Sequence, residues 1–264
     1  MAMYKHILFG KKSFCPDWQL VLNNINKSNI IIRDFNNFDE FKKTILNKNI
    51  SYVLPLSQGD YNSALSHIKK MNSNIKVLYP TNQTRELLRN KNKFTEFMLK
   101  NYIEYIPDIY YLNNIKLKDI EYPAISKPVY STNGSNMTII YNNNDLLKLK
   151  EYNNIQKFID NQYEYSAFIL CIDGRIITQK IIRFKYEKYT IKKQNFPKEY
   201  ENVDNFNTEV FKNIINKLCY SGGINFDFKF DEINNKLYIF EINPRFGGSA
   251  FTNNFIYELL CVNE

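Results

Sequence analysis

Near the end of the chain, two short segments carry oxygen-bearing side chains that could bind a metal ion. Glu241 and Asn243 alternate with apolar residues in segment 236–243, and Asp227 has a similar place in segment 223–230. Carboxylate and amide groups on largely apolar strands are costly unless each finds a partner. Oxygen ligands converging on a hard cation would satisfy them, and Mg²⁺ shared with nucleotide phosphates is the commonest such case.

The pairing of these two strands decides whether the three side chains meet. A two-residue loop at Asn234-Asn235 would set Asp227 opposite Ile242, on the wrong face, whereas an odd loop would set Asp227 beside Glu241. The alternation also predicts that Tyr238, Phe240 and Ile242 share one face of the second strand. Judged from the hairpin alone, these three polar residues could also be solvent-facing positions of a half-buried sheet.

A sharp turn follows the hairpin and suits an anion. Pro244 and Arg245 precede a small-residue run, so an arginine and backbone amides lie just past the carboxylates. The residues of that run are Gly247, Gly248 and Ser249.

Two upstream segments could contact a nucleotide. A strand predicted at 124–128 delivers Lys127, and a small-polar loop from Ser131 to Asn136 could place N–H groups over phosphates. Segment 156–159 is extended enough for a flat heterocycle to bind its backbone, with Glu164 available to accept ribose hydroxyls. Each segment alone also fits an ordinary strand and turn.

The composition excludes several other classes of protein. The 264 residues include only two histidines, and they contain no GxxxxGK[ST] or GxGxxG motif, so zinc, triad and P-loop chemistry lack their residues. The net charge of +8 is spread along the chain, which argues against a nucleic-acid partner. Scattered cysteines, the absence of a long apolar run and a start unlike a signal peptide predict a cytoplasmic protein with no membrane partner.

Hydrophobic patterning predicts the elements that position these residues. Strands at 4–9, 30–32, 52–56 and 76–79 alternate with helices at 38–46 and 61–71, which is typical of a small parallel α/β unit. One helix is predicted over 87–102. Later strands at 137–141, 166–172 and 175–184, with helices at 145–152 and 208–218, indicate an α+β region with antiparallel sheets. Segment 186–207 has no clear period and is predicted to be a loop.

The order of these segments resembles the ATP-grasp superfamily, in its carbamoyl-phosphate-synthase-like or D-alanine–D-alanine-ligase-like branches. Asn90-Lys91-Asn92-Lys93-Phe94 is similar to the family's D-K-x-x-F, with asparagine in place of aspartate. The most specific part is Glu-Ile-Asn-Pro-Arg at 241–245. The resemblance implies an N-terminal preATP-grasp domain at 1–85 and an ATP-grasp domain at 86–264. Within the latter, subdomains at 115–185 and 186–264 would clasp the nucleotide.

The resemblance also implies a role for each candidate residue. Asp227, Glu241 and Asn243 would bind two Mg²⁺ ions, with Mn²⁺ as a substitute, and Arg245, Lys127 and Glu241 would act on the transferred phosphoryl group. ATP would be bound by Lys91, Lys127, Ser131, Thr132, Asn133, Gly134, Ser135, Gln156, Lys157, Phe158, Ile159 and Glu164. Acid substrates would be bound by Arg245, Gly247, Gly248 and Ser249. Arg183 is a further candidate for the acid because it lies near the end of a strand that faces the predicted loop, and it equally fits a structural ion pair.

Two functions follow as expectations. The first is an ATP-dependent ligase that joins a small-molecule carboxylate to an amine or amino acid through an acyl phosphate. The sequence leaves the oligomeric state open, and the resemblance offers a homodimer as one alternative. The second is an inactive ATP-binding regulator or partner subunit. Asn90, the single glycine of the phosphate loop and the end of the chain at Glu264 favour the second.

Overall fold

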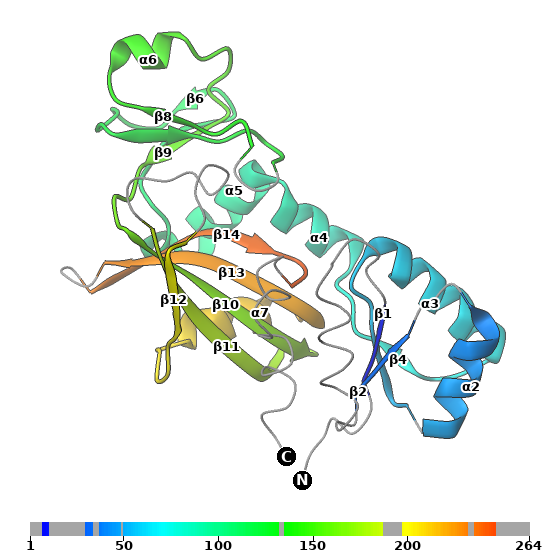
Figure 1. Cartoon of the computed structure of the whole chain (residues 1–264). Helices are drawn as coiled ribbons and strands as arrows, with labels where there is room; N and C mark the ends of the chain where they lie inside the picture. The colour runs from blue at the N-terminus through cyan, green and yellow to red at the C-terminus, as the bar shows by residue number, and fades with distance from the viewer. Residues whose placement is uncertain are drawn as a thin grey trace.

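The structure of the protein is a computed structural model. It describes residues 7–10, 30–33, 37–48, 50–131, 135–186, 197–231 and 235–246. Three sheets make up the described part of the chain, and helices connect and cover them (Figure 1).

The first sheet is parallel and belongs to the N-terminal unit. Its strand order is β2-β1-β3-β4, with β1 (Ile7–Gly10), β2 (Ile30–Arg33), β3 (Tyr52–Leu54) and β4 (Lys76–Val77). Two helices, α2 (Phe38–Lys48) and α3 (Gln58–Met71), pack their apolar faces into a small core with Val53. Ser57 caps α3 by accepting a hydrogen bond from the Asp60 N–H at 3.2 Å. The predicted parallel α/β unit is confirmed.

Two helices lead from this unit to the rest of the molecule. The sequence predicts one helix over 87–102, but the chain forms α4 (Asn82–Arg89) and α5 (Lys91–Asn101), followed by the 3₁₀ helix η1 (Ile103–Tyr105). The break lies at Asn90, whose backbone is extended and whose Oδ1 accepts N–H bonds from Asn92 and Lys93, both at 3.1 Å. Asn90 therefore ends one helix and caps the next.

The second sheet is small and antiparallel, with the order β6-β5-β9-β7-β8. Its buried residues form a core of their own, to which Tyr110 and Ile155 contribute. Its helix α6 (Asn143–Leu147) is shorter than the predicted 145–152. The strands are β5 (Ile109–Leu112), β6 (Ile115–Lys116), β7 (Ala124–Ser126), β8 (Thr138–Ile140) and β9 (Asn154–Lys157).

The third sheet is the largest, and all its neighbouring strands are antiparallel, in the order β12-β11-β10-β13-β14. Part of the predicted loop 186–207 is in fact an edge strand, β12 (Glu199–Asn202), because its backbone pairs with the end of β11. The other strands are β10 (Tyr163–Ile172), β11 (Arg175–Lys185), β13 (Gly222–Asp231) and β14 (Lys236–Asn243).

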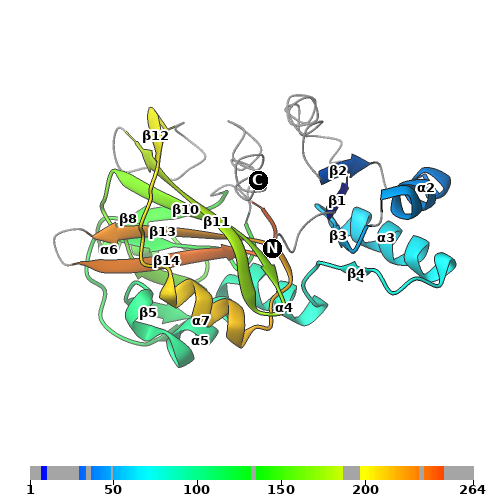
Figure 2. The ribbon, with the colours of Figure 1, turned by 90° about the horizontal axis from the view of Figure 1, so that it is seen from below.

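The two faces of this sheet differ. On one face Tyr165 stacks on Phe228 with ring centres 5.2 Å apart, and helix α7 (Glu209–Lys217) covers both strands (Figure 2). Phe211 of α7 is fully buried there, and burial of such a side chain contributes roughly 1.5–3 kcal/mol. The opposite face carries buried polar side chains on β10 and β13. Alternation along the strands therefore gives the sheet an apolar core face and a polar face.

The N-terminal unit and the large sheet meet backbone to backbone. Gly222 has φ 122°, and a Cβ at this position would lie 3.0 Å from the carbonyl oxygen of Leu78. An ion pair between Lys76 and Asp173 joins the same two regions. The contact fixes how the two regions meet, whereas the predicted domain boundary near residue 85 stays a prediction.

Within the described residues, no helix has the length and apolar character needed to cross a membrane.

Candidate active site

The metal-binding candidates meet because of a β-bulge. Near the loop, Asp231 pairs with Lys236 and Phe228 with Ile239, a register that would leave Asp227 opposite Phe240. The register shifts between Asp227 and Phe228, and beyond the shift Asp227 lies opposite Glu241. The extra residue of β14 therefore does what the sequence interpretation required of an odd loop.

The bulge also corrects the predicted faces of β14. Leu237, Ile239 and Ile242 lie in the core, whereas Tyr238 and Phe240 are not part of it. The expectation that Tyr238 and Phe240 share a face with Ile242 is wrong, because the extra residue inverts the alternation between positions 239 and 242.

Asp227 lies in a dense polar cluster. Its carboxylate accepts hydrogen bonds from Ser166 Oγ at 2.5 Å, Asn225 Nδ2 at 3.0 Å and Asn243 Nδ2 at 3.2 Å. Asn225 is buried, and its Oδ1 atom has no hydrogen-bond partner among the described residues. Oxygen atoms of Asp227, Asn225 and Asn243 are thus gathered on one patch of the sheet, next to Glu241.

The two predicted phosphate lysines reach this patch from separate elements. Lys91 begins α5, is 5% exposed, and donates to Glu241 Oε1 at 3.3 Å. Lys127 follows β7, is 6% exposed, and donates to the carbonyl oxygen of Phe240 at 3.3 Å. The Lys91 N–H also bonds the Val129 carbonyl at 2.9 Å, so the start of α5 is tied to the segment after Lys127.

Lys127 is the electrostatic centre of the site. Burial first, and then the positive charge of Lys91, lower its pKa to about 7, while Glu241 and Glu164 act in the opposite direction. Lys229 also lowers this pKa. The structure therefore brings together charged side chains from α5 and three different strands around one lysine.

The predicted adenine segment lies at the end of β9. The N–H of Lys157 bonds the Asp108 carbonyl at 2.8 Å, and the N–H of Phe158 bonds the Pro123 carbonyl at 3.1 Å. Lys229 donates to the carbonyl oxygens of Ile159 at 2.8 Å and Asn161 at 3.0 Å. Gln156, the first residue of this segment, is buried at 5% exposure, and Glu164 is buried at 6% exposure.

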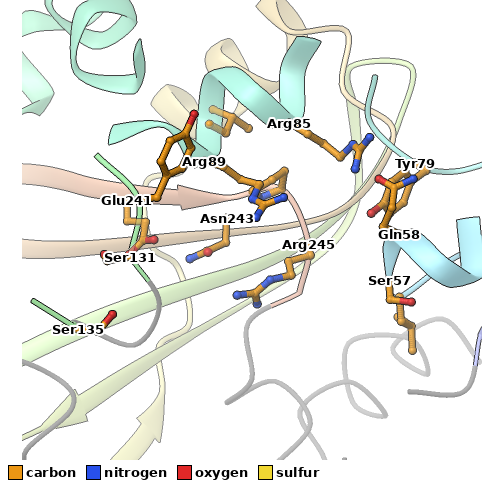
Figure 3. Close-up of a pocket in the computed structure, with 14 residues that line it drawn as sticks. Ser57, Gln58, Tyr79, Arg85, Arg89, Ser131, Ser135, Glu241, Asn243 and Arg245 are labelled. Atoms are coloured by element: carbon orange, nitrogen blue, oxygen red, sulfur yellow. The ribbon is translucent and has the colours of Figure 1, made fainter. Parts of the chain in front are cut away.

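A cavity of about 550 Å³ opens between the N-terminal unit and β14 (Figure 3). Its size is typical of small-molecule sites. The polar and charged residues that line it are Ser57, Gln58, Tyr79, Arg85, Arg89, Tyr130, Ser131, Ser135, Glu241, Asn243 and Arg245. Figure 3 shows Glu241, Ser131 and Ser135 at one end and Arg85, Tyr79 and Ser57 at the other.

Some predicted site residues are not in this cavity. Arg183 lies in a separate cavity of about 320 Å³ at the edge of the large sheet, where it forms an ion pair with Glu201. The loop residues Thr132, Asn133 and Gly134 and the turn residues Gly247, Gly248 and Ser249 lie outside the described residues.

Sequence reasoning missed four residues of the site. Arg85 and Arg89 line the cavity from α4, and their spacing of four beside buried Leu88 was the available signal. Asn225 and Lys229 share a strand face with Asp227, so the alternation that selected Asp227 could have selected them as well.

The metal candidates consist of two carboxylates and amides. Within the described residues, no cluster of three or more His, Cys, Asp or Glu side chains could hold a metal ion. Asp227, Glu241 and the amide oxygens of Asn225 and Asn243 form an all-oxygen set, which suits Mg²⁺ rather than zinc. The unpartnered, buried Asn225 Oδ1 fits a ligand of positive charge.

Three solved structures are similar in fold to this chain. An L-amino acid ligase from Bacillus licheniformis has 15% identity and a TM-score of 0.56, over 96% of this chain and 70% of that chain. A pyruvate carboxylase from Rhizobium etli has 14% identity and a TM-score of 0.58, over 96% of this chain and 27% of that chain.

The third is the biotin carboxylase domain of Hydrogenobacter thermophilus 2-oxoglutarate carboxylase, in complex with MgADP, ADP and bicarbonate. It has 14% identity and a TM-score of 0.53, over 98% of this chain and 70% of that chain. At these identities the similarity shows the fold alone. The comparison with curated protein sequences found no match.

The sequence profile of the ATP-grasp domain matches residues 88–249. This range covers most of the chain, and it includes both lysines, the polar face of the large sheet and the Glu241–Arg245 turn. The predicted fold class, in which a parallel α/β unit precedes an antiparallel ATP-grasp region, is confirmed, and the chain belongs to the ATP-grasp family.

Proposed function

We propose that the protein is an ATP-dependent ligase that joins a small-molecule carboxylate to an amine through an acyl phosphate. ATP would phosphorylate the carboxylate and leave as ADP. The amine would then attack the acyl carbon, form the amide and release phosphate. The similarity to an L-amino acid ligase and to a carboxylase domain that holds MgADP and bicarbonate supports the proposal at the level of the fold.

The observation that carries the proposal is the pairing of Asp227 with Glu241 opposite two buried lysines. The carboxylates face each other across β13 and β14, and Lys91 already touches Glu241 at 3.3 Å. Phosphoryl transfer needs positioning and neutralisation of charge more than covalent help from the protein. Lysines at the start of α5 and just after β7, together with carboxylates on two paired strands, supply both.

We assign the metal ions to the oxygen set on the sheet. Asp227, Glu241 and Asn243 would hold two Mg²⁺ ions, and Asn225 would add an amide oxygen. When bound, Mg²⁺ neutralises charge on the phosphate oxygens that it contacts. The chain's own contribution is a set of ligands whose positions are fixed by strand pairing.

The remaining side chains would position the two substrates. Lys91 and Lys127 would bind phosphate oxygens, and the backbone near Phe158 and Ile159 would bind the base, with Glu164 on the ribose. Ser131 and Ser135 would contact the phosphates from the cavity wall. Arg245 would stabilise the charge that develops as the phosphoryl group moves to the acid.

The test is trapping of the acyl phosphate. The full chain is incubated with Mg²⁺, ATP, a panel of small acids and hydroxylamine, which converts acyl phosphates to hydroxamates. We expect acid-dependent ADP release together with an equal amount of hydroxamate. ATP binding with no ADP release for any acid and amine would contradict the proposal and favour the inactive regulator.

One argument for the inactive regulator is weakened by the structure. Asn90 replaces the family's aspartate, but its Oδ1 accepts two N–H bonds at the start of α5. An aspartate in the same place would cap the helix in the same way. The substitution therefore keeps Lys91 in position and does not by itself indicate loss of activity.

A further inference from the structure

Two arginines in the cavity have no part in the proposed binding of ATP and metal. Arg85 and Arg89 lie one helical turn apart on α4, so their side chains leave the same face of the helix. With Arg245, they give the cavity three guanidinium groups, against the single carboxylate of Glu241 among the described lining residues (Figure 3).

Neither arginine has an ion-pair partner in the part of the chain that the structure describes. Arg85 donates to Asn82 Oδ1, and its guanidinium carbon lies 5.1 Å from the ring centre of Tyr79. Its Nε atom is buried without a hydrogen-bond partner among those residues. Two like charges one turn apart repel each other, and a shared anion would remove that cost.

The nearby carboxylates are engaged elsewhere. Glu86 accepts hydrogen bonds from Tyr130 at 2.7 Å and Lys93 at 3.1 Å. The Glu241 carboxylate contacts Lys91 and is assigned to the metal. The positive charge of Arg85 and Arg89 is therefore left for a ligand.

We propose that Arg85 and Arg89 bind a second anionic group on the acid that the ligase activates. This inference rests on the proposed function and names its substrate class: an acid with a second carboxylate or a phosphate-type group. The reacting carboxylate would lie near Arg245 and Glu241, and the second anion would lie toward Tyr79 and Ser57. Guanidinium groups bind both kinds of anion through paired N–H donors.

The same geometry predicts how the site discriminates between acids. A monocarboxylate of equal length would leave both guanidinium groups without an anion in a confined cavity. Selectivity between substrates is largest where the wrong ligand leaves polar groups of the site unpaired. The structure therefore assigns Arg85 and Arg89 to substrate selection.

The test is direct binding of acids to the protein saturated with Mg²⁺ and a nonhydrolysable ATP analogue. The calorimetric probes are dicarboxylates from malonate to adipate, 3-phosphonopropionate, and butyrate and valerate as monocarboxylates. We expect at least one dianion to bind tenfold or more tightly than the monocarboxylate of equal length. Tighter binding of the phosphonate than of the dicarboxylates would identify the second group as phosphate-like. Tighter binding of a dicarboxylate would identify it as a carboxylate.

Variants then locate the contact. Arg85→Gln and Arg89→Gln should each weaken dianion binding about tenfold and leave monocarboxylate and nucleotide binding unchanged. Arg175→Gln, which removes an exposed arginine of β11, is the matched control and should change none of them. Equal binding of dianions and monocarboxylates, no dianion binding, or a loss confined to the nucleotide would overturn the proposal.

ADP formation, measured in parallel samples that contain ATP in place of the analogue, separates this inference from the ligase itself. Arginine-dependent dianion binding without acid-dependent ADP formation would overturn the ligase and keep the anion site. Amide formation from monocarboxylates as fast as from dianions would overturn the anion site and keep the ligase.

Discussion

Two arginine-containing cavities, the larger beside β14 and the smaller at the edge of the large sheet, balance their charges differently. In the smaller one, Arg183 pairs with Glu201, and Lys185 pairs with Glu199 at 3.2 Å, so β11 and β12 neutralise each other. In the larger one, Arg85 and Arg89 have no carboxylate partner among the described residues. Unbalanced positive charge in a confined site attracts anions. Charge balance, rather than the presence of arginine, therefore distinguishes a ligand site from a structural one.

This difference bears on the predicted role of Arg183. The sequence offered a substrate carboxylate or a structural ion pair as equal alternatives. The Glu201 partner, together with the Arg183 guanidinium carbon 4.7 Å from the ring centre of Tyr163, favours the ion pair. The substrate role of Arg183 stays a prediction. The larger cavity suits an acid substrate better, because its arginines have no carboxylate partner among the described residues.

The largest expected effect is that of Glu241→Gln in the larger cavity, compared with the same type of substitution, Glu201→Gln, in the smaller one. Glu241→Gln should lower ATP turnover on the order of 10³-fold, because it removes a carboxylate that we assign to the Mg²⁺ ions, which neutralise the phosphate charge. Glu201→Gln should change turnover less than about twofold, because it breaks only an exposed ion pair. ADP release measures both. Similar losses in the two variants would break the comparison between the cavities.

The second prediction uses the lowered pKa of Lys127. The free protein loses this proton as pH rises through about 7, whereas phosphates bind the protonated lysine. Affinity for MgATP should therefore fall as pH increases above 7, by up to about tenfold per pH unit. Calorimetry in buffers of different ionisation enthalpy should detect proton uptake on binding. Lys127→Met should abolish the uptake, and its persistence would assign the proton to another group.

The third prediction concerns Lys229, a buried cation that donates to the carbonyl oxygens of Ile159 and Asn161. Lys229→Met should raise the KM for ATP about tenfold, since charged hydrogen bonds of this kind contribute about 1.5–3 kcal/mol. The KM for the acid should not change. Lys185→Met in the smaller cavity is the matched control. An increase confined to the acid would show that Lys229 does not act through the segment that holds the base.

The smallest effect is expected at the break between α4 and α5. Asn90→Ala should lower the free energy of unfolding by about 1 kcal/mol, because two N–H groups at the start of α5 lose their acceptor. Asn90→Asp should retain both stability and activity. Denaturant unfolding and ADP release measure the pair. Loss of activity in Asn90→Asp would show that the amide does more than cap the helix.

The fold was largely predictable because apolar periodicity decides which elements form. The parallel N-terminal sheet and the last two strands follow from alternation and helical spacing. The helix break at Asn90 was missed because apolar residues continue at helical spacing on both sides of it. Strand β12 was missed because its four residues are all exposed, so no alternation marks it.

The site was predictable where a local motif holds it and not where remote elements meet. Glu241, Asn243 and Arg245 stand close together in the sequence, and so they were found together. Arg85 and Arg89 reach them only because α4 packs beside β14. No local pattern contains that contact, although the arginine spacing was visible.

The bulge in β14 makes the carboxylate pair tolerant of slippage near the hairpin loop. The four residues from Leu237 to Phe240 all have large apolar or aromatic side chains. Either Leu237 and Ile239 or Tyr238 and Phe240 could therefore face the core. If the loop gained one residue and the bulge disappeared, Tyr238 and Phe240 would replace Leu237 and Ile239 inside. Asp227 would still face Glu241, so a one-residue insertion at the hairpin tip can leave the pairing of the two carboxylates unchanged.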